Sequence, residues 1–243
     1  SWTIGGAIVS FILSVIAIVA NFVDMGTFGD FMINYSYIFH FVTALGMVTL
    51  FMFVDFNTIS PGANDNLTGT YAAVCALRML DMAGVDFENT EVCAMITDGE
   101  EAGLRGCKSW AKNHYDEYVN SGVETVVLCV DTLTDREYLR VYNKDMTGTV
   151  KNNQQFSQLV MDASKDAGHD DIELSSVFFG SSDAAAFSQA GITATCLAAM
   201  DPRPADYYHN RRDTADRLVP ETIKTGFDVI ISTILNFDEK GLN

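Results

Sequence analysis

Two uncharged apolar runs at the start of the chain constrain its fold more than any other feature. Residues 4–23 read IGGAIVSFILSVIAIVANFV, and residues 31–54 read FMINYSYIFHFVTALGMVTLFMFV, in which His40 alone can carry a charge near neutral pH. A helix of about 20 apolar residues spans the hydrocarbon core of a bilayer. With the short link DMGTFGD between them, the runs predict a two-helix transmembrane hairpin over residues 1–56. The alternative is a pair of buried core helices.

After residue 57 the pattern changes to strands that alternate with helices. Such alternation predicts an α/β domain over residues 57–243, with a mainly parallel central sheet and helices on both faces in three layers. The predicted strands cover residues 91–97, 124–131, 137–143, 175–179 and 193–200. The predicted helices cover residues 70–84, 104–119, 152–168, 183–191 and 220–237.

Charge and cysteine content exclude several classes of protein. The formal net charge is -17, and the first basic residue is Arg78. Nucleic-acid binding depends on clustered Lys and Arg, so a nucleic-acid partner is not expected. The five cysteines lack CxxC spacing, which argues against a zinc knuckle or a disulfide scaffold. The sequence sets no oligomeric state.

Acidic residues and one histidine follow the predicted strands. DGEEAGLRG follows residues 91–97, Asp131 ends the next strand, and YYHNRRDT comes after residues 193–200. Ligands of α/β sheets bind beyond the carboxyl ends of the strands. Carboxylates that converge there repel one another unless a cation or protons neutralise them. We therefore expect a metal ion at this edge.

The residue types favour zinc. Zinc takes about four ligands from His, Asp, Glu and Cys, and a catalytic zinc leaves one position open. The candidate ligands are Asp65, Glu101, Asp131 and His209. The adjacent Glu100 remains free to act as a general base that takes a proton from water.

At this point the motifs SPGANDNLTG, DGEEAGLRG, GSSDAAAF and YYHNRRDT, together with the strand that ends at Asp131, resemble those of the zinc-dependent aminopeptidases with a co-catalytic two-metal site. Glutamate-carboxypeptidase-like enzymes, glutaminyl cyclases and the transferrin-receptor ectodomain belong to the same family. The resemblance runs from about residue 60 to residue 235. It implies a peptide substrate and a zinc peptidase fold.

The resemblance also implies a role for each candidate. Asp65 would bridge two zinc ions, Glu101 and His209 would complete one site, Asp131 would belong to the other, and Glu100 would be the general base. It further implies a cis peptide bond between Asp65 and the next residue. The expected function is that of a membrane-anchored zinc aminopeptidase, with a glutaminyl cyclase or a non-catalytic receptor-like module as alternatives.

Other interpretations of these residues remain open at the level of sequence. Asp65 is also typical of a helix N-cap, and Asp131 of a residue that caps a turn. The glutamates suit the first turn of a helix, and His209 suits an ordinary surface loop. Asp183 has two interpretations, as a helix cap and as a residue that supports the site.

One expected ligand is absent. The family usually carries a His-x-Asp motif on a strand before the bridging Asp, and here that interval is the second apolar run. One zinc site is therefore complete, while the other has two carboxylates. Either the hairpin is inserted after a His-x-Asp strand that precedes Ser1, or the protein uses a single zinc. With that strand, two zinc ions are expected; the 243-residue chain should bind at most one tightly and be poorly active.

Overall fold

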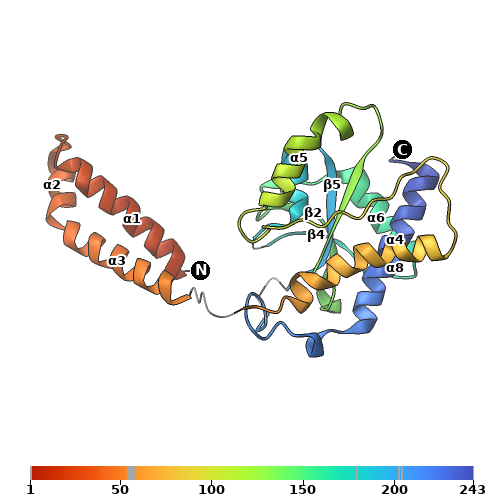
Figure 1. Cartoon of the computed structure of the whole chain (residues 1–243). Coiled ribbons are helices and arrows are strands. Elements are labelled where there is room, and N and C mark those ends of the chain that lie inside the picture. The colour runs from red at the N-terminus through yellow and green to blue at the C-terminus, as the bar shows by residue number, and fades with distance from the viewer. Residues whose placement is uncertain (1, 54–58, 179, 202, 204, 243) are drawn as a thin grey trace. The chain divides into compact units, whose positions relative to one another are not determined.

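The computed structural model describes residues 2–53, 59–178, 180–201, 203 and 205–242. The chain divides into two compact units, Ser1–Ile59 and Ser60–Asn243. Residues 54–58, between the helices of the first unit and the second unit, lie outside the described part, as does Phe179 of the strand predicted at 175–179. Figure 1 shows the elements of both units, which are considered separately.

The first unit contains three helices rather than the expected two. They are α1 (Trp2–Ala20), α2 (Gly26–Asn34) and α3 (Ser36–Phe53). The link predicted between the two helices is partly helical, because α2 begins inside it at Gly26. The chain bends again at Tyr35. Asp24 accepts a hydrogen bond from the Gly26 amide (2.9 Å) and so closes the turn before α2.

The expected two-helix transmembrane hairpin is not confirmed. Within the described residues, no single helix combines the length and apolar character needed to cross a bilayer. The pair Gly26–Asn34 and Ser36–Val48, bent by 54°, meets both requirements together, and Ile8–Ala20 is a shorter apolar helix.

The second unit is a three-layer α/β domain. Its irregular turn η1 (Ala63–Thr68) leads into α4 (Gly69–Met82). The strands are β1 (Val126–Asp131), β2 (Leu139–Asp145), β3 (Val150–Lys151), β4 (Leu174–Ser176) and β5 (Thr193–Ala199). The remaining helical elements are α5 (Arg105–Tyr118), η2 (Arg136–Tyr138), α6 (Gln154–Asp166), α7 (Asp183–Gln189), η3 (Ala215–Arg217) and α8 (Pro220–Lys240).

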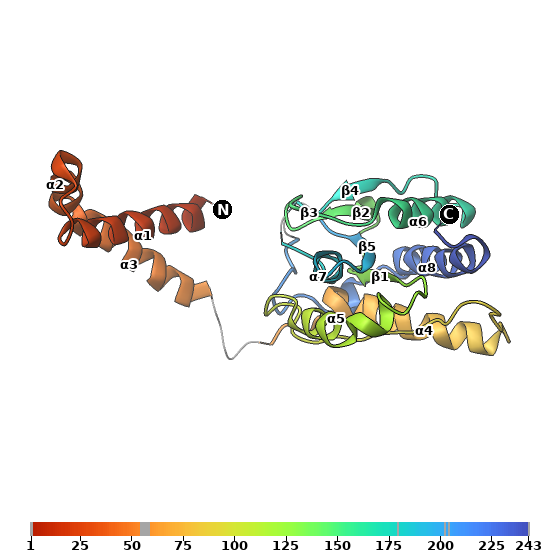
Figure 2. The same cartoon turned by 90° about the horizontal axis from the view of Figure 1, so that it is seen from above.

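Helices cover both faces of the sheet, as predicted. Residues of α4, α6 and α8 form one apolar core with Leu197 of β5. Residues of α5 and α7 form the other with Cys196, which follows the alternation of side chains along a strand. Figures 1 and 2 show α5 on one side of β5, and α6 and α8 on the other.

The sheet is mixed, so it agrees with the expected α/β fold in part, with antiparallel pairs beside the parallel ones. The strand order is β1-β5-β2-β3, and β4 pairs with β2. The β1–β5 and β2–β4 pairs are parallel, whereas β2 runs antiparallel to β5 and β3. A parallel crossover needs about a dozen residues or more. Residues 132–138, between β1 and β2, are too few for one, so β2 returns in the opposite direction.

The strand predicted at residues 91–97 does not form within the described chain. These residues adopt no regular structure, although their sequence EVCAMIT is typical of a buried strand. In the described residues, β1 is hydrogen-bonded to β5 alone, and residues 91–97 pair with neither β1 nor another strand.

A close approach of backbones joins α4 to the end of β1. A Cβ atom added to Gly69 would lie 2.2 Å from the Val130 carbonyl oxygen and 2.6 Å from the Asn66 side-chain oxygen. The Asn66 amide group donates to the same carbonyl (2.9 Å). Gly69 therefore lets η1 pack directly against the end of β1, which brings Asp65 and Asp131 to the same edge.

Replacing Gly69 with Ala should destabilise the second unit. The added methyl group must displace backbone atoms, which costs about 1–3 kcal/mol in tightly packed sites, more than the roughly 1 kcal/mol that Ala gains over Gly in a helix. Urea unfolding measures the difference. The exposed Tyr71 of the same helix provides the control, since Tyr71→Ala should change stability by less than about 0.5 kcal/mol. Equal stability of the two variants would contradict the close packing.

Candidate metal centre

Three of the predicted ligands meet at one point. Nε2 of His209 lies 3.2 Å from Oδ2 of Asp65 and 2.7 Å from Oε1 of Glu101. One ligand atom from each residue lies within 4.8 Å of the others. These residues come from three segments that are far apart in the sequence, the turn η1, the loop before α5 and the loop after β5.

The proximity of two carboxylates changes the protonation of the histidine. Hydrogen bonds to Asp65 and Glu101 raise the pKa of His209 to about 10, against a smaller lowering by burial. In the metal-free protein the imidazolium ion thus neutralises part of the acidic cluster. A metal cation at the same place would replace this proton and leave a neutral imidazole as its ligand.

Asp131 lies beside this cluster and is not one of its three members. Burial raises the pKa of Asp131, and the negative charges of Asp65 and Glu100 add to the effect. Its Oδ1 atom is buried and has no hydrogen-bond partner among the described residues. A buried carboxylate oxygen without a partner is costly. Its position next to Asp65 therefore fits a second cation ligand.

Glu100 is held in a tight turn before α5. Its carbonyl oxygen accepts hydrogen bonds from the amides of Gly103 (2.9 Å) and Leu104 (2.8 Å). Burial, together with the charges of Glu101 and Asp183, raises the pKa of its carboxyl group to about 7, although His209 lowers it. A carboxyl group with a pKa near neutral can both accept and return a proton.

Asp183 extends the acidic group around Glu100. It is the first residue of α7, and its Oδ2 atom accepts a hydrogen bond from Thr97 Oγ1 (2.9 Å). Its Oδ1 atom is buried without a partner in the described part of the chain. The N-cap of α7 is Ser182, so the Asp183 carboxylate lies in the first turn without a capping hydrogen bond, and its charge contributes to the raised pKa of Glu100.

The bridging candidate Asp65 is fixed by a residue that sequence reasoning missed. The buried Asp213 accepts hydrogen bonds from the backbone amides of Asn64 (2.8 Å) and Asp65 (2.9 Å). The N-cap positions of η1 and α4 are occupied by Gly62 and Thr68, so Asp65 does not serve as the helix cap considered above. The Asp65–Asn66 peptide bond is cis, which confirms that prediction. Asp213 follows the candidate ligand His209 closely in the sequence, and this proximity was the signal that could have identified it as part of the site.

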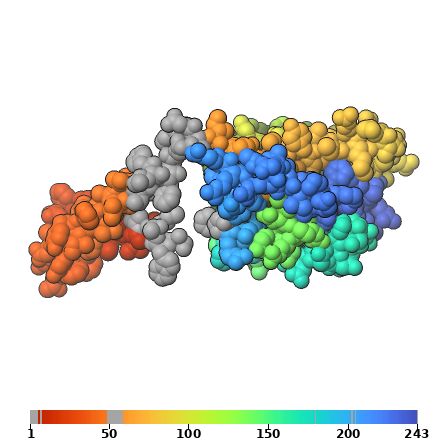
Figure 3. All heavy atoms as spheres, turned by 90° about the horizontal axis from the view of Figure 1, so that it is seen from below, coloured from red at the N-terminus to blue at the C-terminus, as the bar shows by residue number. Residues whose placement is uncertain are grey.

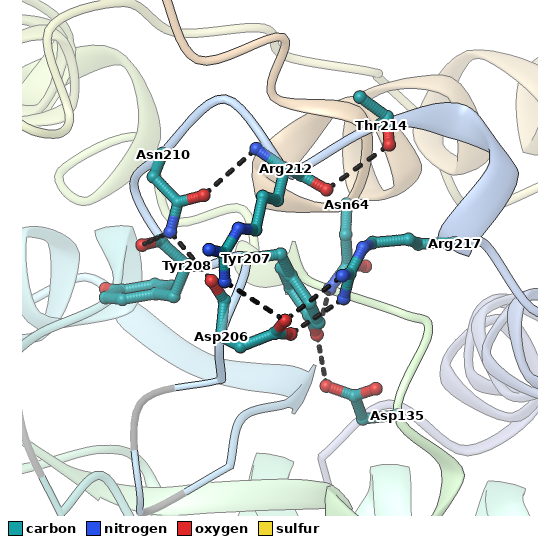
Figure 4. A network of polar contacts seen from close by, with 9 residues as sticks. All are labelled: Asn64, Asp135, Asp206, Tyr207, Tyr208, Asn210, Arg212, Thr214 and Arg217. Atoms are coloured by element: carbon teal, nitrogen blue, oxygen red, sulfur yellow. Dashed lines mark hydrogen bonds and ion pairs between the residues drawn. The ribbon is translucent and has the colours of Figure 1, made fainter.

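The loop that carries His209 is braced by many polar contacts, drawn in Figure 4. Arg217 binds both carboxylate oxygens of Asp206 (2.7 and 3.1 Å). The Tyr207 hydroxyl donates to Asp135 and accepts from the Asn64 side chain (3.2 Å). These contacts hold the loop against η1, and Figure 3 shows the two segments side by side on the surface, in blue and orange.

An aromatic side chain fixes the imidazole itself. The ring of Tyr208 stacks on that of His209, with 3.7 Å between centroids. His209 has a positive φ of 56°, which is uncommon for a residue other than glycine. A cavity of about 230 Å³ opens next to Tyr208, and its walls include Met200 and Arg140.

Comparison with known proteins agrees with this geometry. The model of peptidase family M28 matches residues 47–234, which is most of the chain. The chain belongs to peptidase family M28. The aminopeptidase YwaD of Bacillus subtilis is 27% identical over 194 residues, which cover 72% of this chain and 37% of that protein.

Solved structures share the fold. A zinc aminopeptidase from Bacillus subtilis has a TM-score of 0.58 at 24% identity, over 72% of this chain and 42% of that one. The aminopeptidase LapA of Legionella pneumophila has a TM-score of 0.61 at 17% identity, over 74% of this chain and 48% of that one. A glutaminyl cyclase from an Acidobacteriales bacterium has a TM-score of 0.55 at 16% identity, over 74% and 63%. The chain spans less than half of the matched aminopeptidases.

Replacing Asp213 with Asn should weaken zinc binding although Asp213 is not itself a candidate ligand. The variant replaces one of the two accepting oxygens with an NH2 group, which faces a backbone N–H group, so one of the two hydrogen bonds is lost and Asp65 is loosened. Loss of such a supporting contact typically lowers metal affinity about 10–100-fold. A competitive titration with a chromogenic chelator measures the affinity.

The exposed Asp216 in the same loop provides the control, and Asp216→Asn should leave zinc affinity unchanged. A folded Asp213→Asn variant that binds zinc as tightly as the parent chain would show that Asp65 does not depend on this contact.

Proposed function

We propose that this M28 domain works as a zinc aminopeptidase, with zinc held by Asp65, Glu101 and His209. The observation that carries the proposal is the convergence of these three ligand atoms within 4.8 Å next to a glutamate whose pKa is near neutral. The donor set, two carboxylates and one imidazole, is one that catalytic zinc uses. Asp131 would add a ligand for a second ion.

Each residue has a defined part in the proposed reaction. Zinc, when bound, supplies a Lewis acid that polarises a carbonyl group and makes water more acidic. Glu100 accepts the proton of the attacking water and passes it to the leaving amine, because its pKa of about 7 suits both transfers. Tyr208 keeps the imidazole of His209 in place by stacking.

Glu100→Gln should abolish hydrolysis while zinc stays bound. Removal of a general base lowers the rate by about 100- to 10,000-fold. Release of the amine from aminoacyl amides by the full-length protein measures the rate, and atomic absorption measures the zinc. The exposed Glu173 offers a matched control, because Glu173→Gln should retain full activity. A normal rate in zinc-loaded Glu100→Gln would disprove the mechanism.

A single-zinc glutaminyl cyclase is the second candidate. It is favoured by the one complete set of three ligands and is compatible with the fold shared with a cyclase. Peptides with N-terminal glutamine distinguish the two enzymes in the same assay. Cyclisation without hydrolysis of aminoacyl amides would favour the cyclase, and absence of both activities would favour a binding module.

We also propose that the first unit anchors the protein in a membrane. Its packing is the reverse of that of a soluble helical bundle. Small and polar side chains such as Ser10, Ser14 and Ala17 are buried in it, while large apolar ones such as Phe11 and Phe41 are more than half exposed. Small and hydroxyl-bearing residues between helices, with large apolar residues outside, are typical of helices in lipid.

Hydrogen bonds join the two longer helices along the buried side. Ser10 Oγ donates to the Phe39 carbonyl oxygen (2.7 Å), and Ser14 Oγ lies 3.2 Å from Thr43 Oγ1. Thr43 also donates to Phe39 within its own helix (2.8 Å). These contacts satisfy the polar groups of α1 and α3 internally, as the interior of a bilayer requires.

A charge on the outer side of α1 should therefore impair insertion. Val15 is exposed, and Val15→Lys would place an ammonium group near the middle of α1 at a cost of about 2.5–3.5 kcal/mol in lipid. Flotation with phosphatidylcholine vesicles after detergent removal measures the bound fraction, which should fall. Met82→Lys, at an exposed site of the second unit, is the control and should float like the parent. Equal flotation of all three would contradict the anchor.

A further inference from the structure

The cavity of about 230 Å³ beside Tyr208 adjoins the metal centre. Its walls include Asn64, Thr132 and Tyr208, each of which is the chain neighbour of a candidate ligand. A peptide whose first amide bond lies at the metal centre would therefore have its N-terminal side chain at the mouth of this cavity. The chemistry of the cavity walls then decides which side chain fits.

One wall of the cavity is formed by β2 and β4 and carries hydrogen-bond donors. Arg140 and Tyr142 are two residues apart on β2, so their side chains lie on the same face of the sheet. Ser175 of β4 is the register partner of Tyr142 and lies beside it. All three residues line the cavity. A guanidinium group and two hydroxyl groups thus stand together on this wall.

The charge of Arg140 is poorly compensated by the described residues. Its Nη1 atom donates to the Leu139 carbonyl oxygen (2.8 Å), and its Nε atom lies 3.9 Å from a carboxylate oxygen of Glu173. That distance is too long for a hydrogen bond, and the Glu173 side chain is 75% exposed, so the pair contributes little. A guanidinium group has several further N–H donors. Those of Arg140 have no acceptor in the described part of the chain.

The two carboxylates that line the same cavity are already engaged. Asp135 accepts a hydrogen bond from the Tyr207 hydroxyl, as Figure 4 shows. Asp201 accepts one from the backbone amide of Arg203 (2.8 Å) and lies 3.8 Å from the guanidinium group of the same residue. Among the described residues, neither carboxylate forms an ion pair with Arg140. The donors on the wall are therefore open to an anion from outside the chain.

The Tyr142 hydroxyl is a donor that keeps its proton. Tyr142 is 4% exposed, and burial raises its pKa. The backbone amide of Met200 and the positive charge of Arg140 oppose this rise without cancelling it. The hydroxyl group is therefore neutral near pH 7, and the charge of Arg140 reaches it. Both groups can donate to the same carboxylate.

We propose that this cavity selects substrates with an acidic N-terminal residue, whose side-chain carboxylate binds Arg140, Tyr142 and Ser175, a role that rests on the proposed aminopeptidase function. A guanidinium group matches the two oxygens of a carboxylate in geometry and charge. Met200 and Tyr208 on the other walls contact the methylene groups of the same side chain. A basic side chain would meet a like charge, and an uncharged one would leave the partly buried guanidinium unpaired.

Binding of two matched amides tests the proposal without catalysis. The α-amides of glutamic acid and of glutamine have nearly the same shape and differ in side-chain charge. Calorimetry on zinc-loaded, full-length Glu100→Gln protein, which should not hydrolyse them, should show that the glutamic acid amide binds at least tenfold more tightly. Arg140→Met in the same background should reduce this preference about 10- to 100-fold.

Arg136→Met is the matched control for the binding experiment. It removes the same charge from a neighbouring residue that does not line the cavity, so it should leave the preference unchanged. Tighter binding of the glutamine amide, no binding of either amide, or a preference that survives Arg140→Met would overturn the proposal. If the preference holds but the parent protein hydrolyses no aminoacyl amide, the aminopeptidase function alone is contradicted.

Hydrolysis rates separate a specificity role of Arg140 from a structural one. In the full-length protein, Arg140→Met should lower kcat/KM for glutamyl p-nitroanilide about 10- to 100-fold and leave that for leucyl p-nitroanilide unchanged or higher. Arg140→Lys keeps the charge without the planar fork, so it should restore part of the glutamyl activity. An equal fall for both substrates in Arg140→Met, with no recovery in Arg140→Lys, would show that Arg140 only supports the fold.

Discussion

Mutual repulsion of carboxylates at one edge of the sheet governs the arrangement of the second unit. Asp65, Glu100, Glu101, Asp131 and Asp183 come together there, and burial together with their mutual charges raises the pKa values of Glu100 and Asp131. In the metal-free chain the imidazolium of His209 offsets part of this charge. A divalent cation does so more completely, because it binds several carboxylates at once. The cluster is thus costly to fold alone and well suited to hold zinc.

The rest of the edge is built to resist this repulsion. Asp213 uses both carboxylate oxygens to hold backbone amides of the turn η1. The Asn66 side chain joins the same turn to Val130 of β1 and to Thr132 just after it, and it also accepts a hydrogen bond from the Gly69 amide of α4. These hydrogen bonds hold the acidic side chains together despite their repulsion, and they join segments that are remote in sequence. A site of this kind is therefore sensitive to residues that touch neither metal nor substrate.

The two units follow opposite rules of packing. In the second unit, apolar side chains such as Phe156 and Phe187 are buried, and most charged side chains lie outside. In the first unit, the buried positions carry Ser10, Ser14 and Ala17, and large apolar residues lie outside. This contrast is the basis of our proposal that the first unit lies in hydrocarbon, whereas the second folds in water. The internal hydrogen bonds of the first unit support this interpretation.

The sequence by itself determined most elements of the second unit, the family motifs and the candidate ligands, because apolar periodicity and residue chemistry are local properties. The predicted strand at 193–200 and helix at 220–237 correspond to β5 and α8 with small changes at their ends. Tertiary structure decided what depends on distant partners. The strand predicted at 91–97 has no partner in the described chain and stays unpaired, the direction of β2 follows from the seven residues before it, and the role of Asp213 depends on a turn almost 150 residues away. Such features arise from hydrogen bonds and charges across the fold, which no local pattern records.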